Sequence, residues 1–260
     1  MSSLQGKVCL ITGASSGIGA ATAIHFASLG AKLALTGRDK DSLEATKANC
    51  IEEGLEEKEV FLCAGDLTVD ADVERIIKKC TAYYKGTLDV LVNNAGIARH
   101  GTLLDTTMDV YDSVMSINIR AVFYLTQLAA PFLMETKGAI VNVSSVNGVR
   151  SFYGTNAYCI SKAALDQFTR CTALDMAAYG VRCNAVNPGM IPTNILQRAG
   201  MSDEACEAFL ERCKRTHALG RIGTTDEVAK AIAFLASAES SFSTGATFPV
   251  DGGRHAMCPR

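Results

Sequence analysis

Short apolar runs alternate with amphipathic stretches along almost the whole chain, and this alternation restricts the fold more than any other feature. Runs short enough for buried strands lie at 8–12, 32–36, 60–63, 90–92, 139–143, 181–186 and 246–250. Stretches with helical periodicity lie between them, near 17–29, 40–53, 70–84, 108–134, 157–179 and 225–237. Such alternation indicates a parallel sheet covered by helices on both faces. We therefore predict an α/β, doubly wound fold in a single domain that spans residues 1–260.

Length and composition agree with one folded domain. The 260 residues suffice to bury a sizeable core, and no repeat or low-complexity linker interrupts them. One segment, 190–221, falls outside the alternation; it is polar and helix-prone, and we expect it to form a lid over a substrate. We expect no signal or transit peptide and no membrane span, hence a cytoplasmic protein.

Charge and cysteine usage narrow the expected partners. A net charge of −2 and a pI of about 6.1 give no indication of a nucleic-acid or anionic-membrane partner, which leaves a small molecule. The ten cysteines are scattered without a CxxC pair, so we expect reduced thiols. Cys206, Cys213 and His217 form a candidate metal cluster, but a fourth ligand at zinc spacing is missing. Packing is therefore the favoured role, and no metal is expected.

A glycine-rich segment, Thr12-Gly-Ala-Ser-Ser-Gly-Ile-Gly19, follows the first expected strand. Its three glycines would let the backbone approach a pyrophosphate, and the next helix would offer N–H groups and its positive dipole end. The spacing is a variant of the dinucleotide fingerprint, and the absence of a following Gly-Lys-Ser/Thr excludes a P-loop. The segment therefore predicts a dinucleotide site.

The residues after the second strand indicate which dinucleotide binds. An NAD-preferring site would place Asp or Glu near position 37 for the ribose 2′-hydroxyl. Gly37 supplies no carboxylate, whereas Arg38 offers a guanidinium for a 2′-phosphate, with Ser15 as a hydroxyl donor. The alternative makes Arg38 a solvated charge and Asp39 or Asp41 a helix cap. We favour NADP over NAD.

Tyr158 and Lys162 are four residues apart on an expected helix, so their side chains share a face. An unperturbed tyrosine titrates near ~10, and a nearby ammonium lowers that pKa by roughly 1–3 units. The pair is a candidate proton donor and acceptor for a carbonyl and its alcohol. Alone, this spacing is usually a solvated helix pair; Ser145, thirteen residues upstream, strengthens the interpretation, and Ser144 competes with it.

These motifs, together with Asp66-Leu-Thr, Asn93-Asn-Ala-Gly96, Asn118, Asn187-Pro-Gly189 and Asp251-Gly-Gly253, resemble the short-chain dehydrogenase/reductase family in order and spacing. The resemblance covers essentially the whole chain. It implies a Rossmann-type fold with a seven-stranded parallel sheet and a tetrad of Asn118, Ser145, Tyr158 and Lys162. Ser145 would hold the substrate oxygen and Tyr158 would exchange the proton. Lys162 would lower the Tyr158 pKa and bind the nicotinamide ribose, and Asn118 would disturb its helix and hold a relay water.

The glycine loop and the resemblance together give the expected contacts. Coenzyme contacts are expected from Gly13, Ser15, Ser16, Gly17, Ile18, Gly19, Arg38, Asp66, Leu67, Asn94, Ala95, Gly96, Tyr158, Lys162, Pro188, Gly189, Ile191 and Thr193. For Asp66 the alternative is a simple turn residue. Substrate contacts are expected from Ser145, Asn147, Arg150, Phe152, Tyr153 and Tyr158. This loop mixes one charge with two aromatic rings, which suits an apolar carbonyl with a polar end.

Within the family, the nearest likeness is to bacterial 3-oxoacyl-acyl-carrier-protein reductases, which grip the acidic carrier with surface arginines. Thr136 and Tyr179 stand at the corresponding positions here. This departure favours a free ketone, such as a steroid, a quinone or a xenobiotic. We therefore expect an NADP-dependent carbonyl reductase.

Three further expectations concern assembly, redox state and an alternative function. Family members of this size usually form homotetramers, and we expect the tail 255–260 to cover a subunit interface. Cys159, beside Tyr158, is a candidate for redox control, although packing is favoured. The alternative function is a catalytically silent nucleotide sensor on the same fold. Such proteins typically lose the Tyr or Lys that this chain keeps.

Overall fold

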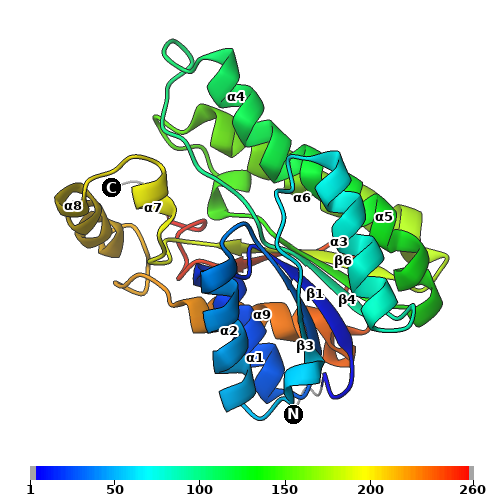
Figure 1. Cartoon of the computed structure of the whole chain (residues 1–260). Coiled ribbons are helices and arrows are strands. Elements are labelled where there is room, and N and C mark those ends of the chain that lie inside the picture. The colour runs from blue at the N-terminus through cyan, green and yellow to red at the C-terminus, as the bar shows by residue number, and fades with distance from the viewer. Residues whose placement is uncertain (1–3, 258–260) are drawn as a thin grey trace.

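The computed structural model describes residues 4–257, and its centre is a seven-stranded sheet whose neighbouring strands all run parallel (Figure 1). The strands are β1 (Val8–Thr12), β2 (Lys32–Thr36), β3 (Val60–Leu62), β4 (Val90–Asn93), β5 (Ala139–Val143), β6 (Arg182–Pro188) and β7 (Thr247–Val250). Their order is β3-β2-β1-β4-β5-β6-β7. The order reverses between β1 and β4, and ligands of such sheets bind outside the carboxyl ends of the strands at that point. The doubly wound fold is thus confirmed.

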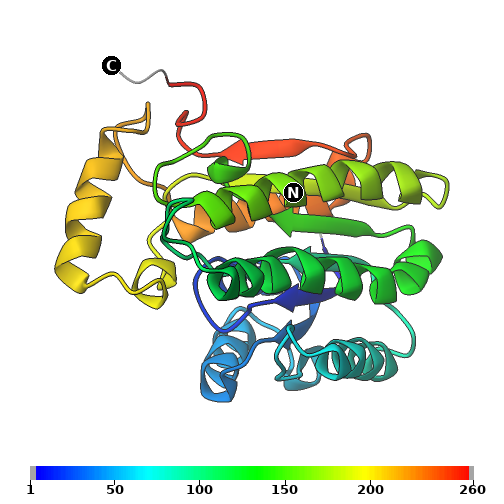
Figure 2. The ribbon, with the colours of Figure 1, turned by 90° about the horizontal axis from the view of Figure 1, so that it is seen from above.

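Helices cover both faces of this sheet. One face carries α1 (Gly17–Ser28), α2 (Lys40–Glu52) and α9 (Thr225–Ala236). The other carries α3 (Asp70–Tyr83), α5 (Ala121–Thr136) and α6 (Asn156–Ala177). Figure 2 shows α5 and α6 running side by side over the second face. Because both faces are covered, a central strand such as β1 is buried at every residue.

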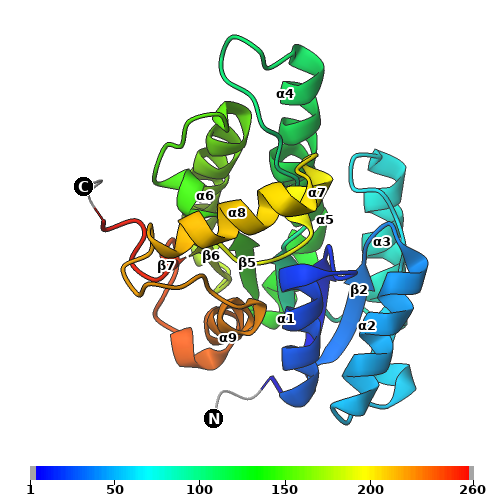
Figure 3. The same ribbon diagram turned by 90° about the vertical axis from the view of Figure 1, so that its left-hand side faces the viewer.

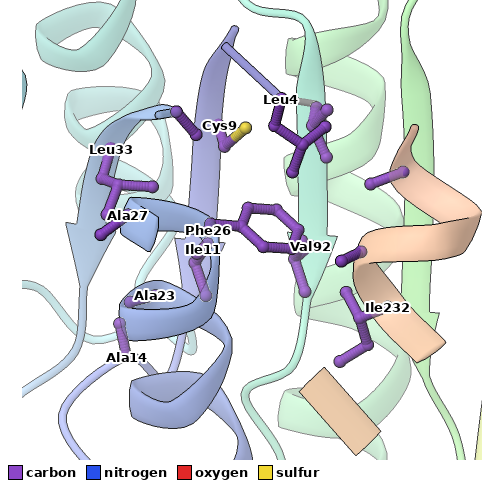
Figure 4. Packing of buried hydrophobic residues seen from close by; sticks show 14 of the residues in the cluster. Leu4, Cys9, Ile11, Ala14, Ala23, Phe26, Ala27, Leu33, Val92 and Ile232 are labelled. Atoms are coloured by element: carbon purple, nitrogen blue, oxygen red, sulfur yellow. The ribbon is translucent and has the colours of Figure 1, made fainter. Parts of the chain in front are cut away.

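Phe26 of α1 anchors the first face. Its side chain is fully buried. Figure 4 shows the ring among Ile11 of β1, Val92 of β4 and Ile232 of α9. Burying a side chain of this size stabilises the fold by about 1.5–3 kcal/mol, and truncating it to alanine typically costs ~3–5 kcal/mol. This packing fixes α1, and with it the glycine loop that begins the helix.

Capping groups set the helix ends. Asp39 accepts a hydrogen bond from the Ser42 N–H at 2.9 Å and so begins α2. Thr224 and Glu227 form a capping box at the start of α9. Lys137, with a φ of +50°, ends α5 in the left-handed conformation.

A continuous helical run extends from Met108 to Thr136. It comprises α4 (Met108–Met115), one π-helical segment, η2 (Ser116–Arg120), and α5. By length and composition alone this run is able to cross a membrane, a test that the core helices of soluble proteins also pass. Here it packs along α3, where Arg120 pairs with Asp70 at 2.5 Å.

The segment 190–221 lies at the carboxyl end of the strands. It contains the short helix α7 (Ile195–Arg198) and α8 (Asp203–Lys214), which pack through Leu196, Cys206 and Cys213. Figure 2 shows these helices beyond the strand arrowheads, and Figure 3 shows α8 crossing in front of them. The segment therefore stands at the edge where such a sheet binds ligands.

Candidate active site

The glycine loop joins β1 to α1 and is held in place by two polar side chains. Thr12 Oγ1 accepts hydrogen bonds from the backbone N–H groups of Asn94 at 2.9 Å and Ala95 at 3.0 Å. The Asn94 amide donates in return to the Thr12 carbonyl at 2.8 Å. A Cβ on Gly19 would lie 2.3 Å from the Gly13 carbonyl oxygen, so glycine is required there. The loop is therefore fixed by contacts within the protein.

The start of α1 presents backbone donors that the protein itself leaves uncapped. The side chain of Ser16, the residue before the helix, makes no capping hydrogen bond, and the first turn contains no acidic residue. Gly17 has a φ of +58°, and a Cβ there would lie 3.0 Å from the Thr193 methyl carbon. A pyrophosphate at this helix terminus would meet unpaired N–H groups and the positive end of the dipole. The loop, Ile18 included, and Thr193 fit a dinucleotide coenzyme.

Gly37, Arg38 and Ser15 meet where β2 ends. A Cβ on Gly37 would lie 3.2 Å from Ser15 Oγ. Arg38 is exposed and borders a cavity of about 1020 Å³ together with Gly65 and Asp66. Within residues 4–257 its guanidinium has no hydrogen-bond or ion-pair partner. The group is therefore available to an external anion.

Asp66 forms the turn that follows β3. Its Oδ1 accepts hydrogen bonds from the Thr68 N–H at 2.9 Å and the Thr68 hydroxyl at 2.8 Å. Leu67, the next residue, is buried. Asp66 thus acts as a turn residue, which was the alternative role considered for it. It also borders the cavity beside Arg38, which is compatible with a coenzyme contact.

β5 and α6 bring Ser145, Tyr158 and Lys162 together. Ser145 follows β5 and begins the short 3₁₀ helix η3 (Val146–Gly148), while Tyr158 and Lys162 lie on one face of α6. The Ser145 side chain lies close enough to Tyr158 to lower the pKa of its hydroxyl. Lys162 Nζ donates to the Val143 carbonyl at 2.8 Å and lies 5.7 Å from the centre of the Tyr158 ring.

Burial determines the protonation of both groups. It raises the pKa of Tyr158 to about 12, and the hydrogen bond with Ser145 opposes this rise. Burial also lowers the pKa of Lys162 to about 8, against the opposing charge of Asp166. Burial is the largest cause of the Tyr158 pKa in this structure, and the lowering of that pKa by Lys162 stays a prediction.

Asn118 lies fully buried in the π-helical segment η2. Its Oδ1 accepts from the Ile97 N–H at 2.9 Å, and its Nδ2 donates to the Ile97 carbonyl at 3.0 Å and to Ser161 Oγ at 2.9 Å. A Cβ on Gly96 would lie 3.1 Å from Asn118 Oδ1 and 3.6 Å from Lys162 Nζ. The π-helical segment interrupts the regular α-helix, as expected. The side-chain amide, which was expected to hold a water, instead donates hydrogen bonds to the Ile97 carbonyl and to Ser161.

Asn147 is the expected substrate residue that lies closest to Ser145. Its backbone N–H donates to Ser145 Oγ at 3.1 Å, and its side-chain Nδ2 donates to Cys159 Sγ at 3.3 Å. Asn147 thereby fixes the Ser145 hydroxyl beside Tyr158. Cys159 is half-buried and takes part in this packing.

The other three loop residues have different surroundings. Arg150 donates to the carbonyl oxygens of His255 at 2.6 Å and Met257 at 3.3 Å, and the Arg254 guanidinium lies 4.6 Å from the centre of the Phe152 ring. Tyr153 is 95% exposed. The structure therefore brings Arg150 to the C-terminal segment rather than to Tyr158, and leaves Tyr153 in solvent. Of the tail, 258–260 lies outside the described residues.

A buried carboxylate behind the site was missed by the sequence reasoning. Asp166 is 2% exposed and lies one helical turn after Lys162. Asn187 Nδ2 donates to Asp166 at 3.0 Å and to the Ser145 carbonyl at 2.9 Å. Ser144 Oγ donates to the Lys162 carbonyl at 3.2 Å, which leaves Ser145 to face Tyr158. The sequence signal that could have indicated this carboxylate was Asn187, because an amide inside a buried apolar strand needs a polar partner.

The backbone that leaves β6 is closely packed. A Cβ on Gly189, the residue after Pro188, would lie 2.7 Å from His217 Nε2, and Ile191 is buried. His217 contacts the Cys213 carbonyl oxygen, at 2.6 Å, rather than its thiol. Within residues 4–257, no three His, Cys, Asp or Glu side chains converge as metal ligands would.

Thr136 and Tyr179 lie at the far ends of their helices from the catalytic residues. Thr136 is the last residue of α5, and its hydroxyl donates to the Leu88 carbonyl at 2.8 Å. Tyr179 follows α6, whereas Tyr158 lies in its first turn; at 1.5 Å per residue the two are about 30 Å apart. Within one protomer these positions do not reach the site, so they do not discriminate between carrier-bound and free substrates.

The chain resembles known proteins over nearly its full length. The family described as Enoyl-(Acyl carrier protein) reductase matches residues 13–255. The chain is 39% identical over 251 residues to the 3-oxoacyl-[acyl-carrier-protein] reductase FabG of Thermotoga maritima, covering 96% of this chain and 98% of the relative. It is 37% identical over 247 residues to the meso-2,3-butanediol dehydrogenase of Serratia marcescens, covering 95% and 94%. A cofactor-containing short-chain dehydrogenase/reductase of unknown function from Caenorhabditis elegans superposes with a TM-score of 0.93 at 36% identity, covering 98% and 97%.

Proposed function

Because this chain belongs to the short-chain dehydrogenase/reductase family, we propose that it interconverts a ketone and a secondary alcohol with NADP(H). The family uses nicotinamide coenzymes and acts on CH–OH groups. The observation that carries the proposal is the convergence of Ser145, Tyr158 and Lys162 at the carboxyl edge that also holds the glycine loop.

In the proposed site the substrate oxygen lies between the hydroxyl groups of Ser145 and Tyr158. During reduction Tyr158 donates its proton to this oxygen, and during oxidation it takes the proton back. Burial raises the pKa of Tyr158 to about 12, so the hydroxyl is protonated at neutral pH, as reduction requires. The nicotinamide, when bound, supplies or accepts the hydride. In this proposal Lys162, whose ammonium lies beside Gly96, holds the ribose hydroxyls.

Two features support NADP over NAD. The Arg38 guanidinium has no partner within residues 4–257 and borders a cavity, and Ser15 supplies a hydroxyl beside Gly37. Position 37 has no carboxylate to bind a 2′-hydroxyl or repel a 2′-phosphate. A guanidinium with an adjacent hydroxyl donor suits a phosphate.

We propose a free small molecule as the substrate, covered by the 190–221 segment. Asn147 and Phe152 offer one polar and one apolar group on the loop after Ser145, which suits an apolar carbonyl with a polar end. One relative is named for a carrier-bound substrate and another for a free diol. We further propose that the enzyme is a cytoplasmic homotetramer without a nucleic-acid or membrane partner, in line with its near-neutral charge.

The test is Tyr158→Phe, assayed with a panel of ketones and alcohols and both coenzymes. The variant keeps the ring but loses the proton, so kcat should fall by about 10²–10⁴-fold while coenzyme affinity and thermal stability persist. Tyr153→Phe is the matched control, because that hydroxyl lies in solvent, and it should keep full activity. A folded Tyr158→Phe variant that reduces a good ketone at the unmutated rate would rule out the mechanism.

A further inference from the structure

His217 connects the end of α8 to the backbone that leaves β6. The imidazole is 3% exposed. Its Nδ1 lies 2.6 Å from the Cys213 carbonyl oxygen, and its Nε2 lies 3.0 Å from the Met190 backbone nitrogen. A carbonyl accepts and a backbone N–H donates, so Nδ1 carries the hydrogen and Nε2 accepts. These two partners require the neutral ring in one tautomer.

A second proton on His217 has no acceptor at this position. It would sit on Nε2 and face the Met190 N–H, so two donors would oppose each other. Burial lowers the pKa of His217; the Cys213 carbonyl and Asp251 act to raise it, and Arg254 acts to lower it. Asp251 is already bonded to the backbone N–H of His255 at 2.6 Å. The surroundings therefore favour the neutral ring.

Two glycines make room for the ring. A Cβ on Gly189 would lie 2.7 Å from His217 Nε2, and a Cβ on Gly252, where φ is +55°, would lie 3.5 Å from His217 Cβ. The Leu219 N–H also donates to the Gly252 carbonyl at 3.1 Å. The imidazole is thus enclosed by α8, by the backbone after β6 and by the turn after β7.

The backbone that His217 holds leads directly to residues proposed to bind the coenzyme. Its bond fixes the N–H of Met190, and the Gly223 N–H fixes the Met190 carbonyl at 3.0 Å. Ile191 and Thr193 follow, and the Thr193 methyl faces Gly17 of the glycine loop. A shift at Met190 would therefore move this wall of the proposed coenzyme site.

We propose that neutral His217 is a positioning residue for coenzyme binding. It holds the Met190 backbone so that Ile191 and Thr193 face the coenzyme, and it fastens α8 to the same backbone. Protonation of His217 opposes the Met190 N–H and weakens coenzyme binding at acidic pH. The inference rests on the proposed coenzyme site. The contacts of His217 with Cys213 and Met190 are independent of that proposal.

The test compares His217→Phe, which keeps a ring but removes both nitrogens, with His217→Gln, whose side-chain oxygen can accept the Met190 N–H without titrating. Fluorescence titration with NADPH at pH 8 should show about 5–150-fold weaker binding for His217→Phe, since a buried N–H loses its partner. His217→Gln should bind within about threefold of the unmutated protein, because it rescues the acceptor. His25→Gln, in the last turn of α1 at the end opposite the glycine loop, is the matched control and should leave binding unchanged.

The pH profile separates positioning from simple packing. Between pH 8 and pH 5.5 the unmutated protein should lose affinity relative to His217→Gln; phosphate and other side chains titrate in both proteins and cancel in the ratio. Hydrogen exchange supplies a readout without coenzyme: the Met190 amide should exchange faster in His217→Phe and slowly in His217→Gln.

Two results would overturn the inference: unmutated affinity in His217→Phe at pH 8, or a ratio to His217→Gln that does not change with pH. Thermal unfolding of each variant shows whether the loss is global. Failure of the unmutated protein to bind either coenzyme would remove the proposed function, and this inference with it. Normal binding that does not depend on His217 would remove the inference alone.

Discussion

Arg38 differs from other arginines on the surface of this molecule. Arg75, Arg120 and Arg221 form ion pairs with Asp72, Asp70 and Glu227, respectively. Arg38 lacks such a partner in the described part of the chain and faces the cavity beside Asp66. A guanidinium without such a partner breaks no ion pair of the protein when it binds an anion. We therefore predict that Arg38 determines the coenzyme preference.

Arg38→Ala should weaken NADPH binding by roughly 10–150-fold and leave NADH binding nearly unchanged, because one charge-assisted hydrogen bond is worth ~1.5–3 kcal/mol. Fluorescence titration with both coenzymes measures the change. Arg170→Ala is the control, since that guanidinium is hydrogen-bonded to Gln167 on the exposed face of α6. Equal affinities of the unmutated protein for NADPH and NADH would contradict the assignment.

Sequence reasoning at the residue scale succeeded where the determinant is local. A helical spacing of four puts Tyr158 and Lys162 on one face, and a left-handed φ or a tight contact explains each glycine of the loop. It failed where a partner comes from far along the chain. The Lys162 ammonium ends on the Val143 carbonyl, and His217 ends on Met190, because β5 and β6 bring those groups there. No spacing within one helix encodes either contact.

At the scale of elements, the π-helical segment η2 links two parts of the candidate site. Its wider turn places Asn118 inward, where the amide bonds Ile97 of the loop after β4 and Ser161 of α6. Three hydrogen bonds of one buried side chain thus join elements that are distant in sequence. A loss of this amide would leave the Ile97 N–H and carbonyl without partners.

Asn118→Ala should lower the free energy of unfolding by about 1–3 kcal/mol for the polar groups left unpaired. It should also reduce turnover, since Gly96 lies beside both this amide and the Lys162 ammonium. Urea unfolding at neutral pH measures the first effect. Ser113→Ala, on the exposed side of α4, removes one local hydrogen bond and should change stability by far less. Equal stabilities for the two variants would show that the Asn118 contacts are not stabilising.

Element boundaries were predictable only where a local signal marks them. In the sequence, Asp39 marks the start of α2, and the capping box of Thr224 and Glu227 marks the start of α9. The strand expected at 181–186 runs instead from Arg182 to Pro188, because Asn187 and Pro188 pair with β7. The helices α7 and α8 were not resolved from the pattern, since their apolar residues pack mainly on one another.

At the scale of the whole molecule, large apolar side chains remain exposed on the outer face of the long helices. Met108 of α4, Phe123 of α5 and Leu174 of α6 are 66%, 55% and 80% exposed. The helices α5 and α6 lie side by side (Figure 2), and the ring of Phe123 on α5 lies 5.7 Å from that of Phe168 on α6. Apolar surface gathered in this way is typical of a subunit interface.

We expect a homotetramer that uses this face, so light scattering should give a mass near four times the 27.5 kDa of one chain. Phe123→Glu combined with Leu174→Glu should shift the protein to smaller species, because charge on both helices opposes their burial. Glu substituted for Phe61, an aromatic residue on the edge strand β3, would keep the tetramer. A mass of one chain for the unmutated protein in dilute buffer would refute the expectation.

The global architecture was predictable from the sequence because buried parallel strands appear as short continuous apolar runs. All seven expected strands are present, and the helices between them alternate across the sheet. Periodicity does not predict which strands become neighbours in the sheet. The expectation of one sheet with seven strands came from the family resemblance. The placement of 190–221 over the strand ends depends on contacts such as that of His217, which arise only after folding.

The two kinds of glycine near the coenzyme site have different evolutionary prospects. A side chain at Gly19 would collide with backbone, so mutation there removes the site altogether. A Cβ at Gly37 would meet only the Ser15 hydroxyl, at 3.2 Å, and a side chain can turn away from it. One base change at the second codon position converts any glycine codon into one for aspartate or glutamate, the residues that favour NAD. A single codon change at position 37 is therefore expected to move the proposed NADP preference toward NAD, whereas no such change is open to Gly19.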